Sequence, residues 1–282
     1  MASKIIHREE LQLTATQGKM IRSGWGNECV DNSIVEKITY LSDDFKVKGY
    51  IAYPKDQTKK YPCIIWCRGG YGNAGAIDQF NAQGIFGQLA SWGYVVFASQ
   101  YRGNAGGEGK DEFGGSDVND VLNLISLAGE IECADKDIWG IEGWSRGGMM
   151  TYLTLTKANI FKAAIVSGGI ANLRCNAQES KFMHFLYEAS MGKNENVLLN
   201  NCNERSIVYF AEKLSKTTPL LLMHGNADER VLPHDSLDLS YKLLEHNIPF
   251  RLVMFEGGDH FLKSHRKEVD ALRKEWFDKY LR

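Results

Sequence analysis

Short apolar runs alternate with longer amphipathic stretches through most of the chain. A compact apolar run predicts a strand, and apolar residues that recur every three or four positions predict a helix. Strands are expected at 33–41, 45–53, 61–67, 94–100, 137–143, 161–167, 219–224 and 250–255. Helices are expected at 77–92, 117–128, 146–157 and 233–246, and in a final segment whose apolar stripe is Val269, Leu272, Trp276 and Tyr280.

This alternation predicts an α/β fold. Parallel neighbouring strands need a crossover connection, and helices between the strands supply it while they cover both faces of the sheet. The first two strands are separated only by the polar turn 42–44, which predicts an antiparallel hairpin at one edge. The sequence therefore predicts an eight-stranded, mostly parallel sheet with helices on both faces.

Two segments depart from the alternation. Residues 1–32 are polar and contain glycine, and we expect a helical or irregular N-terminal lead-in. Residues 171–216 are too long for a simple connection and have no strand character. Long connections in compact domains are usually lids or helical insertions. We therefore expect a helical cap insertion at 171–216, over the carboxyl ends of the strands of a core made of 33–170 and 217–282.

The composition excludes several classes of partner. A formal net charge of −2 gives no strong field for recruiting nucleic acid or anionic lipid. No apolar stretch is long enough to cross a bilayer, and the first ten residues lack the apolar core of a secretion signal. The six cysteines have no zinc-binding spacing, so we expect reduced, mostly buried thiols and no metal. The sequence predicts a cytoplasmic protein without nucleic-acid or membrane partners, and it leaves open a homo-oligomer.

The candidate chemistry begins at Gly143-Trp144-Ser145-Arg146-Gly147, between a predicted strand and a predicted helix. A serine on such a sharp turn is exposed, and small residues two before and two after it allow the strained backbone. The N–H groups and dipole of the helix start favour a developing anion, so the Arg146 N–H is a candidate oxyanion donor. A plain Gly/Ser helix cap is the alternative interpretation.

The partners of a nucleophilic serine are an acid and a histidine, each just after a later strand. Asp228 follows the strand 219–224, and His260 follows the strand 250–255. The carboxyl ends of parallel strands share one edge of a sheet, so these side chains can converge with the serine. The competing acids are Glu229 and Asp235, the competing bases are Asp259 and His265, and the histidines favoured as structural are His224 and His234.

A second oxyanion donor is expected in the glycine-rich loop after the third strand. It reads Arg68-Gly69-Gly70-Tyr71-Gly72, and small residues let a backbone N–H approach a substrate oxygen closely. The N–H of Gly70 or Tyr71 is the candidate. A turn made flexible by glycine is the alternative.

These motifs together resemble the catalytic domain of the prolyl oligopeptidase family (S9) of serine peptidases, which has the α/β-hydrolase fold. The similar stretches are RGGYGN, YRGN, GGSDVNDV, GWSRGGMM, HGNADERV and GGDH, and they lie within 61–282. The resemblance implies a catalytic triad of Ser145, Asp228 and His260, with the loop 68–71 helping to bind the oxyanion. The family's peptidases usually carry a β-propeller, for which this chain has no room, and often Tyr or His where it has Arg68. Arg102 of YRGN is favoured as a structural ion pair.

The resulting hypothesis is a serine hydrolase that cleaves amide bonds in short peptides through an acyl-enzyme, without a cofactor. A carboxylesterase acting on small acyl esters is the alternative, and a non-catalytic binding protein of the same fold is the third. The residues expected to contact the substrate are Arg68, Trp144, Phe182, Phe185 and Tyr187. The aromatic residues of the cap could equally form the cap's own core.

Overall fold

The computed structural model describes residues 3–282, in which nine strands are hydrogen-bonded in the order β1-β2-β3-β5-β4-β6-β7-β8-β9. The strands are β1 (Ile5–Glu10), β2 (Ser33–Ser42), β3 (Phe45–Pro54), β4 (Tyr61–Cys67), β5 (Val95–Ser99), β6 (Ala134–Trp144), β7 (Phe161–Ser167), β8 (Leu220–Gly225) and β9 (Phe250–Phe255). The α-helices are α1 (Ala15–Trp25), α2 (Glu28–Asp31), α3 (Gln79–Ser91), α4 (Val118–Asn123), α5 (Arg146–Leu155), α6 (Leu173–Glu179), α7 (Lys181–Met191), α8 (Glu195–Arg205), α9 (His234–Glu245) and α10 (Arg266–Leu281). The 3₁₀ turns are η1 (Gly72–Gly75), η2 (Leu124–Glu130), η3 (Ile207–Tyr209), η4 (Ala211–Lys213) and η5 (Lys263–His265). The predicted α/β fold with a mostly parallel sheet is confirmed.

β1 is the strand that the sequence prediction missed, because the lead-in was expected to be helical or irregular and the sheet to have eight strands. It pairs antiparallel with β2, with Glu9 opposite Lys37. Of its six residues only Ile5 is buried, so the strand lacks the apolar–polar alternation that identifies strands in a sequence. Backbone pairing to β2, rather than side-chain burial, makes this segment a strand. The helices α1 and α2 follow it within the lead-in, and α1 begins with a capping box between Thr14 and Gln17.

β2 and β3 form the predicted hairpin. Ser42 lies opposite Phe45 at the turn, and Ser33 lies opposite Pro54 at the far end. Asp43 in the turn has a φ of 50°, a left-handed conformation that Asp adopts more readily than most residues. A short polar turn between two runs of β-forming residues was therefore enough to predict the antiparallel pairing.

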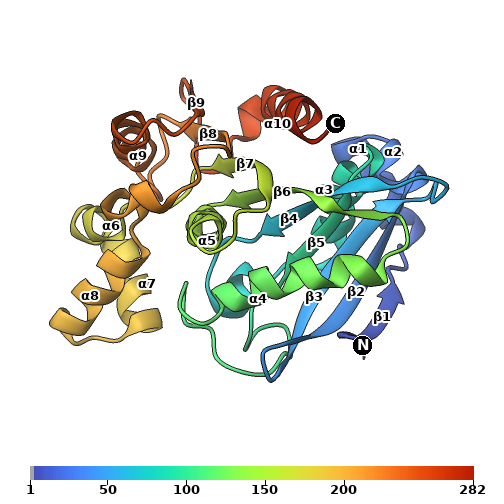
Figure 1. Ribbon diagram of the computed structural model, residues 1–282, viewed down its shortest axis with the longest axis horizontal. Helices are drawn as coiled ribbons and strands as arrows, with labels where there is room; N and C mark the ends of the chain where they lie inside the picture. The colour runs from blue at the N-terminus through green and yellow to red at the C-terminus, as the bar shows by residue number, and fades with distance from the viewer. Residues whose placement is uncertain (1–2) are drawn as a thin grey trace. The chain divides into compact units, whose positions relative to one another are not determined.

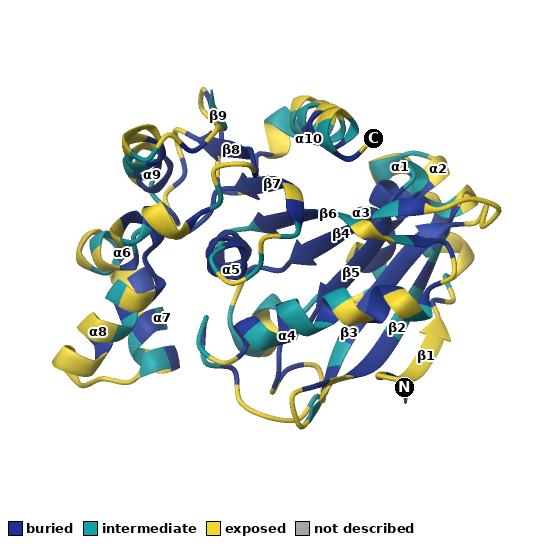
Figure 2. Ribbon diagram, viewed as in Figure 1, coloured by how far each residue is buried: buried dark blue, intermediate teal, exposed yellow. Residues whose placement is uncertain are grey.

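The chain divides into two compact units. The first consists of the residues up to Trp66, Gly72–Asp111 and Asn119–Gly140. In this unit α3 packs against β2, β3 and β5, and α1 and α2 lie beside α3 (Figure 1). All five residues of β5 are buried, whereas β1 is exposed along most of its length (Figure 2).

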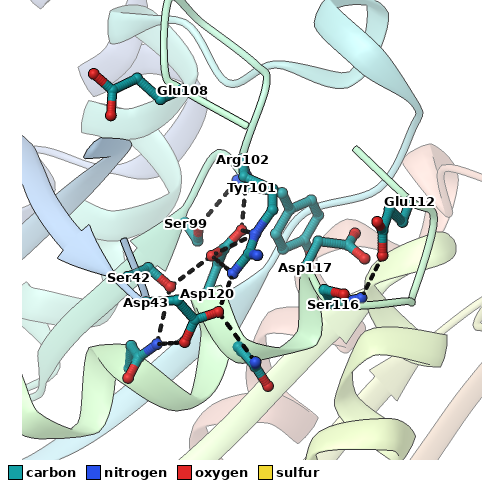
Figure 3. A network of polar contacts seen from close by, with 12 residues as sticks. Ser42, Asp43, Ser99, Tyr101, Arg102, Glu108, Glu112, Ser116, Asp117 and Asp120 are labelled. Carbon is teal, nitrogen blue, oxygen red and sulfur yellow. Dashed lines mark hydrogen bonds and ion pairs between the residues drawn. The ribbon is translucent and has the colours of Figure 1, made fainter. Parts of the chain in front are cut away.

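A buried arginine joins the β2–β3 turn to the segment after β5 within this first unit (Figure 3). Arg102 Nη2 lies 2.7 Å from Asp120 Oδ1 and 2.7 Å from Asp43 Oδ2. The Asp120 carboxylate also accepts the Arg102 backbone N–H at 2.7 Å and the Ser42 hydroxyl at 2.6 Å. Arg102 and Asp120 are both buried. Arg102 therefore makes the structural ion pair that the sequence favoured.

The second unit consists of Cys67–Tyr71, Glu112–Val118 and Ile141–Arg282. α5 and α10 both pack against β7, and they lie on opposite sides of it in Figure 1. α9 packs against β8 and β9. Every residue of α5 is buried, which is why this helix is uniformly dark in Figure 2. β7, β8 and β9 run parallel in this unit, as the crossover helices require.

The segment 171–216 is helical, as the sequence predicted. α6, α7 and α8 pack on one another, and η3 and η4 then pack on α9. These elements form one group beside α9 in Figure 1. The role of this segment as a cap over a site stays a prediction.

α10 buries Trp276 of the predicted stripe, but its other buried residues belong to a neighbouring face. Its buried residues are Arg273, Trp276, Phe277 and Leu281, whereas Val269, Leu272 and Tyr280 are only half-buried. The reason is an ion pair: Arg273 Nη2 donates to Glu142 Oε2 at 3.0 Å, so a charged residue occupies the buried face. Hydrophobic spacing alone cannot identify a face whose central residue is an arginine.

The Asp120→Ala substitution tests the buried network of the first unit. It removes one carboxylate of a buried ion pair, and we expect the free energy of unfolding to fall by about 3 kcal/mol, because the Arg102 charge stays buried with less compensation. The matched control is Asp31→Ala, which breaks the exposed pair with Arg22 and should cost less than about 1 kcal/mol. Urea unfolding at neutral pH measures both. Equal losses in the two variants would contradict a structural role for the network.

Candidate active site

Ser145 lies at the junction of β6 and α5, in a backbone conformation that few residues other than glycine adopt. Its φ is 59° and its ψ is −124°. Such a conformation costs roughly 1–3 kcal/mol and persists only where the surroundings impose it. The Ser145 N–H donates to Ser167 O at 3.0 Å, and the Ser145 carbonyl accepts the N–H groups of Gly148 and Ile170 at 2.9 and 3.2 Å. These bonds hold the serine half-buried at the helix start.

Main-chain atoms approach Gly143 and Gly147 so closely that neither position has room for a side chain. A Cβ on Gly143 would collide with the Gly147 carbonyl, and a Cβ on Gly147 would collide with the Cys67 carbonyl. Both collisions are with main-chain atoms, which cannot rotate away as the end of a side chain can. The G-x-S-x-G spacing is therefore required by the packing of the turn.

His260 lies between Ser145 and Asp228. Its Nδ1 is 2.7 Å from Asp228 Oδ2, and its Nε2 is 3.1 Å from Ser145 Oγ. A carboxylate accepts hydrogen bonds only, so the proton of the neutral imidazole belongs on Nδ1. Nε2 is then the acceptor that faces the serine hydroxyl. The structure thus brings together the three residues that the sequence singled out from separate loops.

The Asp228 carboxylate is buried and receives donors on both oxygens. Oδ1 accepts the N–H groups of Arg230 and Val231 at 2.9 and 3.0 Å, and Oδ2 lies 3.3 Å from His224 Nε2. Burial alone would raise the pKa of Asp228. The hydrogen bonds from His224 and His260, together with attraction to His260, outweigh it and hold the pKa well below its ordinary value. The carboxylate is therefore ionised and able to orient the imidazole.

Trp144 and Gly168 both lie close to the imidazole. Trp144 Nε1 donates to the His260 carbonyl at 3.0 Å, and the two rings lie 5.0 Å apart between centroids. A Cβ on Gly168, whose φ is 51°, would lie 3.3 Å from Asp228 Oδ2 and 3.5 Å from His260 Nδ1. The Trp144 indole, expected as a substrate contact, makes a structural hydrogen bond to the histidine loop.

The competing residues have other surroundings. The Asp235 carboxylate accepts the N–H of Asn172 at 2.9 Å and so anchors the start of the segment 171–216. His265 Nε2 donates to Glu256 O at 3.1 Å. Glu229 and Asp259 are exposed.

The loop 67–71 passes directly against the serine turn. A Cβ on Gly69 would lie 3.1 Å from Ser145 Cβ, so the main chain of this loop is next to the candidate nucleophile. Gly70 has a φ of 71°, a conformation that glycine adopts without strain. Arg68 is buried, and its Nη1 donates to Gly69 O at 3.0 Å. Its guanidinium therefore supports the loop from within the protein.

The aromatic residues of α7 divide into two classes. Phe182 and Phe185 are 60% and 69% exposed. Tyr187 is fully buried, and its ring meets Phe113 edge-on with centroids 5.7 Å apart. Tyr187 is part of a packed interior, whereas Phe182 and Phe185 present apolar surface to solvent.

Within residues 3–282, no group of three or more His, Cys, Asp or Glu side chains is arranged to hold a metal ion. No helix in that range has the length and apolar character of a membrane span. All six cysteines are free, and all but Cys175 are buried, as the sequence predicted.

His224 is the residue at this site that sequence reasoning undervalued. It was favoured as structural, but its Nε2 lies 3.3 Å from Asp228 Oδ2 and 2.9 Å from Val231 O, while its Nδ1 lies 2.7 Å from Ser236 Oγ. Its position at the end of β8, four residues before the acid, was the available signal. A sequence pattern cannot show that the side chain turns toward the carboxylate.

The Asp228→Asn substitution tests the ionised state of this carboxylate. Because folding lowers the pKa of Asp228, its ionised form stabilises the folded protein fully above the unfolded-state pKa near 4, and this stabilisation is lost as the pH falls further. We expect the variant to be less stable than the wild type by roughly 2–3 kcal/mol at pH 7, with a difference that shrinks toward pH 2. Urea unfolding of both proteins from pH 7 to 2.5 measures this difference. A difference that does not vary with pH would contradict the assignment.

The chain is similar in sequence to known peptidases. The family described as the prolyl oligopeptidase family matches residues 81–282. The uncharacterized peptidase YtmA of Bacillus subtilis (strain 168) is 31% identical over 238 residues, which cover 83% of this chain and 90% of YtmA.

Solved structures of similar fold include two acylaminoacyl peptidases. The Pyrococcus horikoshii acylaminoacyl peptidase matches with a TM-score of 0.79 and 26% identity, over 97% of this chain and 45% of that protein. An acylaminoacyl peptidase in complex with Z-Gly-Gly-Phe-chloromethyl ketone matches with a TM-score of 0.77 and 26% identity, over 89% of this chain and 42% of that one. This chain thus spans less than half the length of these two structural relatives. The family match over most of the chain shows that it belongs to the prolyl oligopeptidase family of serine peptidases.

Proposed function

We propose that the chain hydrolyses amide bonds of short peptides, with Ser145 as nucleophile, His260 as general base and Asp228 as the acid that orients the histidine. The observation that carries the proposal is the unbroken line of hydrogen bonds from Asp228 Oδ2 through His260 to Ser145 Oγ, at 2.7 and 3.1 Å. A serine hydroxyl needs such a base because it is a weak nucleophile on its own. The strained turn at Ser145 presents the hydroxyl to that base.

Acylation starts when Ser145 Oγ bonds to the substrate carbonyl carbon and its proton passes to His260 Nε2. The ionised Asp228 stabilises the imidazolium that forms. His260 then gives the proton to the leaving amine as the carbon–nitrogen bond breaks. Water attacks the acyl-enzyme in the same way and releases the acid. The nucleophile, the base and the oxyanion donors all belong to the chain, so the proposed mechanism requires no metal or organic cofactor.

The tetrahedral oxyanion is stabilised by two backbone groups in this proposal. One is the Arg146 N–H at the start of α5, where the helix dipole also favours negative charge. The other belongs to the Gly70–Tyr71 peptide, in the loop that passes against Ser145. Removal of one such donor in other serine hydrolases costs about 10²–10³ in kcat.

The names of the chain's relatives support peptides rather than esters as its substrates. YtmA is named a peptidase, and one acylaminoacyl peptidase of similar fold was solved with a peptidyl chloromethyl ketone. The segment 171–216 supports a bounded site as well, because Arg205 Nε of α8 donates to Phe113 O at 2.9 Å and Tyr187 of α7 packs on the Phe113 ring. The Phe113 ring in turn lies 6.0 Å from the Tyr71 ring of the oxyanion loop. We therefore place this segment beside the site as its cap, with Phe182 and Phe185 available to substrate.

The Ser145→Ala substitution is the direct test of the proposed nucleophile. It should lower kcat at least about 10³-fold, because no other group replaces the nucleophile, while unfolding stays within about 1 kcal/mol of the wild type. The substrates are an aminoacyl-anilide and the p-nitrophenyl ester with the same acyl group. Ser126→Ala, on an exposed turn, is the matched control and should keep full activity.

Two outcomes contradict the proposal in different ways. A Ser145→Ala protein with near-wild-type turnover removes Ser145 from the mechanism. A wild type that hydrolyses the ester but leaves the anilide intact identifies a carboxylesterase instead of a peptidase.

A further inference from the structure

The residue that follows the nucleophile has a side chain that the mechanism has not yet used. Arg146 is 1% exposed, although arginine is seldom fully buried unless it is paired. Its guanidinium does not point to solvent but turns back over the loop 67–71. There its Nη1 donates to the Gly70 carbonyl at 3.0 Å.

We propose that the Arg146 side chain is a positioning residue that orients the Gly70–Tyr71 peptide, so that the N–H of Tyr71 points at the substrate oxyanion. This inference rests on the proposed function, and it assigns the loop's oxyanion donor to Tyr71 rather than Gly70. Arg146 then helps to bind the oxyanion in two ways. Its backbone N–H is one donor, and its guanidinium sets the direction of the other.

The geometry of the peptide group carries the argument. The carbonyl of Gly70 and the N–H of Tyr71 belong to one planar trans peptide, so they point in opposite directions. A donor fixed on the carbonyl oxygen therefore fixes the N–H direction as well. It also polarises the peptide and strengthens the N–H as a donor. Without such a contact Gly70, at a φ of 71°, leaves the peptide plane weakly determined, because glycine has the widest choice of backbone angles.

The guanidinium itself is held on two further sides. Arg146 Nη2 lies 2.6 Å from Asp117 Oδ2, and Asp117 is completely buried. Asp117 also accepts the Gly114 N–H, at 3.0 Å to Oδ1 and 3.2 Å to Oδ2, so the carboxylate is fixed by its own loop. The Phe113 ring lies under the guanidinium, 4.6 Å from ring centroid to Arg146 Cζ. A carboxylate, an aromatic face and a carbonyl together use the planar, multi-donor shape of arginine, which lysine does not have.

Stability alone is a weak reason for this arrangement. Burying an ion pair costs desolvation energy that the pair recovers only in part, and well-packed apolar residues often stabilise as much. A second buried pair in the same unit shows what a purely structural arginine looks like. Arg273 Nη2 donates to Glu142 Oε2 at 3.0 Å, and its Nη1 donates to Asp270 Oδ1 at 2.8 Å. Both arginines are buried and paired with carboxylates, and Arg146 in addition contacts the Gly70 carbonyl.

Arg146→Lys and Arg273→Lys are the matched test. Each keeps the positive charge but replaces the planar guanidinium by a single ammonium, which lacks the fixed donor directions that arginine offers to carboxylate and carbonyl. We expect Arg146→Lys to lower kcat on the p-nitrophenyl ester about 10- to 100-fold with KM within about two-fold of the wild type, because the donor acts on the transition state. The second-order rate of fluorophosphonate labelling at Ser145 should fall by a similar factor. Arg273→Lys should lower the melting temperature at least as much and leave both rates within about two-fold.

A second variant covers the case in which Arg146→Lys does not fold. Asp117→Asn leaves the guanidinium in place but removes its charged anchor, and kcat should fall about three- to ten-fold with KM unchanged. Wild-type rates in whichever of the two variants is folded overturn the inference. Equal loss of kcat in Arg146→Lys and Arg273→Lys also overturns it, since activity would then follow stability. If fluorophosphonate does not label the wild type at Ser145, both the proposed function and this inference are wrong. If the wild type is labelled and the variants keep its kcat and labelling rate, this inference alone is wrong.

Discussion

The backbone turn at Ser145 is the constraint on which the rest of the site depends. A non-glycine residue at φ 59° is strained, and the turn is kept by hydrogen bonds to Ser167, Gly148 and Ile170. The turn can close only because Gly143 and Gly147 let main-chain atoms approach where a Cβ would collide. Through Gly147 the same contact brings the Cys67 carbonyl, and hence the loop 67–71, against Ser145. This one tight turn thus positions the Ser145 hydroxyl, the start of α5 and the loop 67–71 together.

Buried charge is the second organising feature, and each charge is met by several partners. Asp228 receives two backbone N–H groups on one oxygen and two histidines on the other. Arg146 is enclosed by Asp117, the Phe113 ring and the Gly70 carbonyl. A buried ion is tolerated only when its partners replace the lost water, so these groups are held in place more firmly than surface residues. That rigidity suits a site in which sub-ångström placement decides the rate.

Much of this could be predicted from the sequence, because the strongest signals are local. The order of Ser145, Asp228 and His260, each after a strand, follows from the parallel sheet, and strands such as β4 and β7 are compact apolar runs. β1 was missed because an edge strand formed by backbone pairing leaves no alternation. The buried face of α10 differs in part from the predicted stripe because Arg273 lies on it. The contacts of His224 and Arg146 were not predictable, since they depend on where side chains turn within the fold: Asp117 lies 29 residues from Arg146 along the chain.

The measurement that tests the central claim most directly is fluorophosphonate labelling of the intact protein, followed by peptide mapping. The proposed assembly of Ser145, His260 and Asp228 requires one adduct per chain, on Ser145, and its loss in a folded His260→Ala variant. A folded protein that takes no label, or takes it on another residue, would contradict the claim that these three residues form an activated nucleophile.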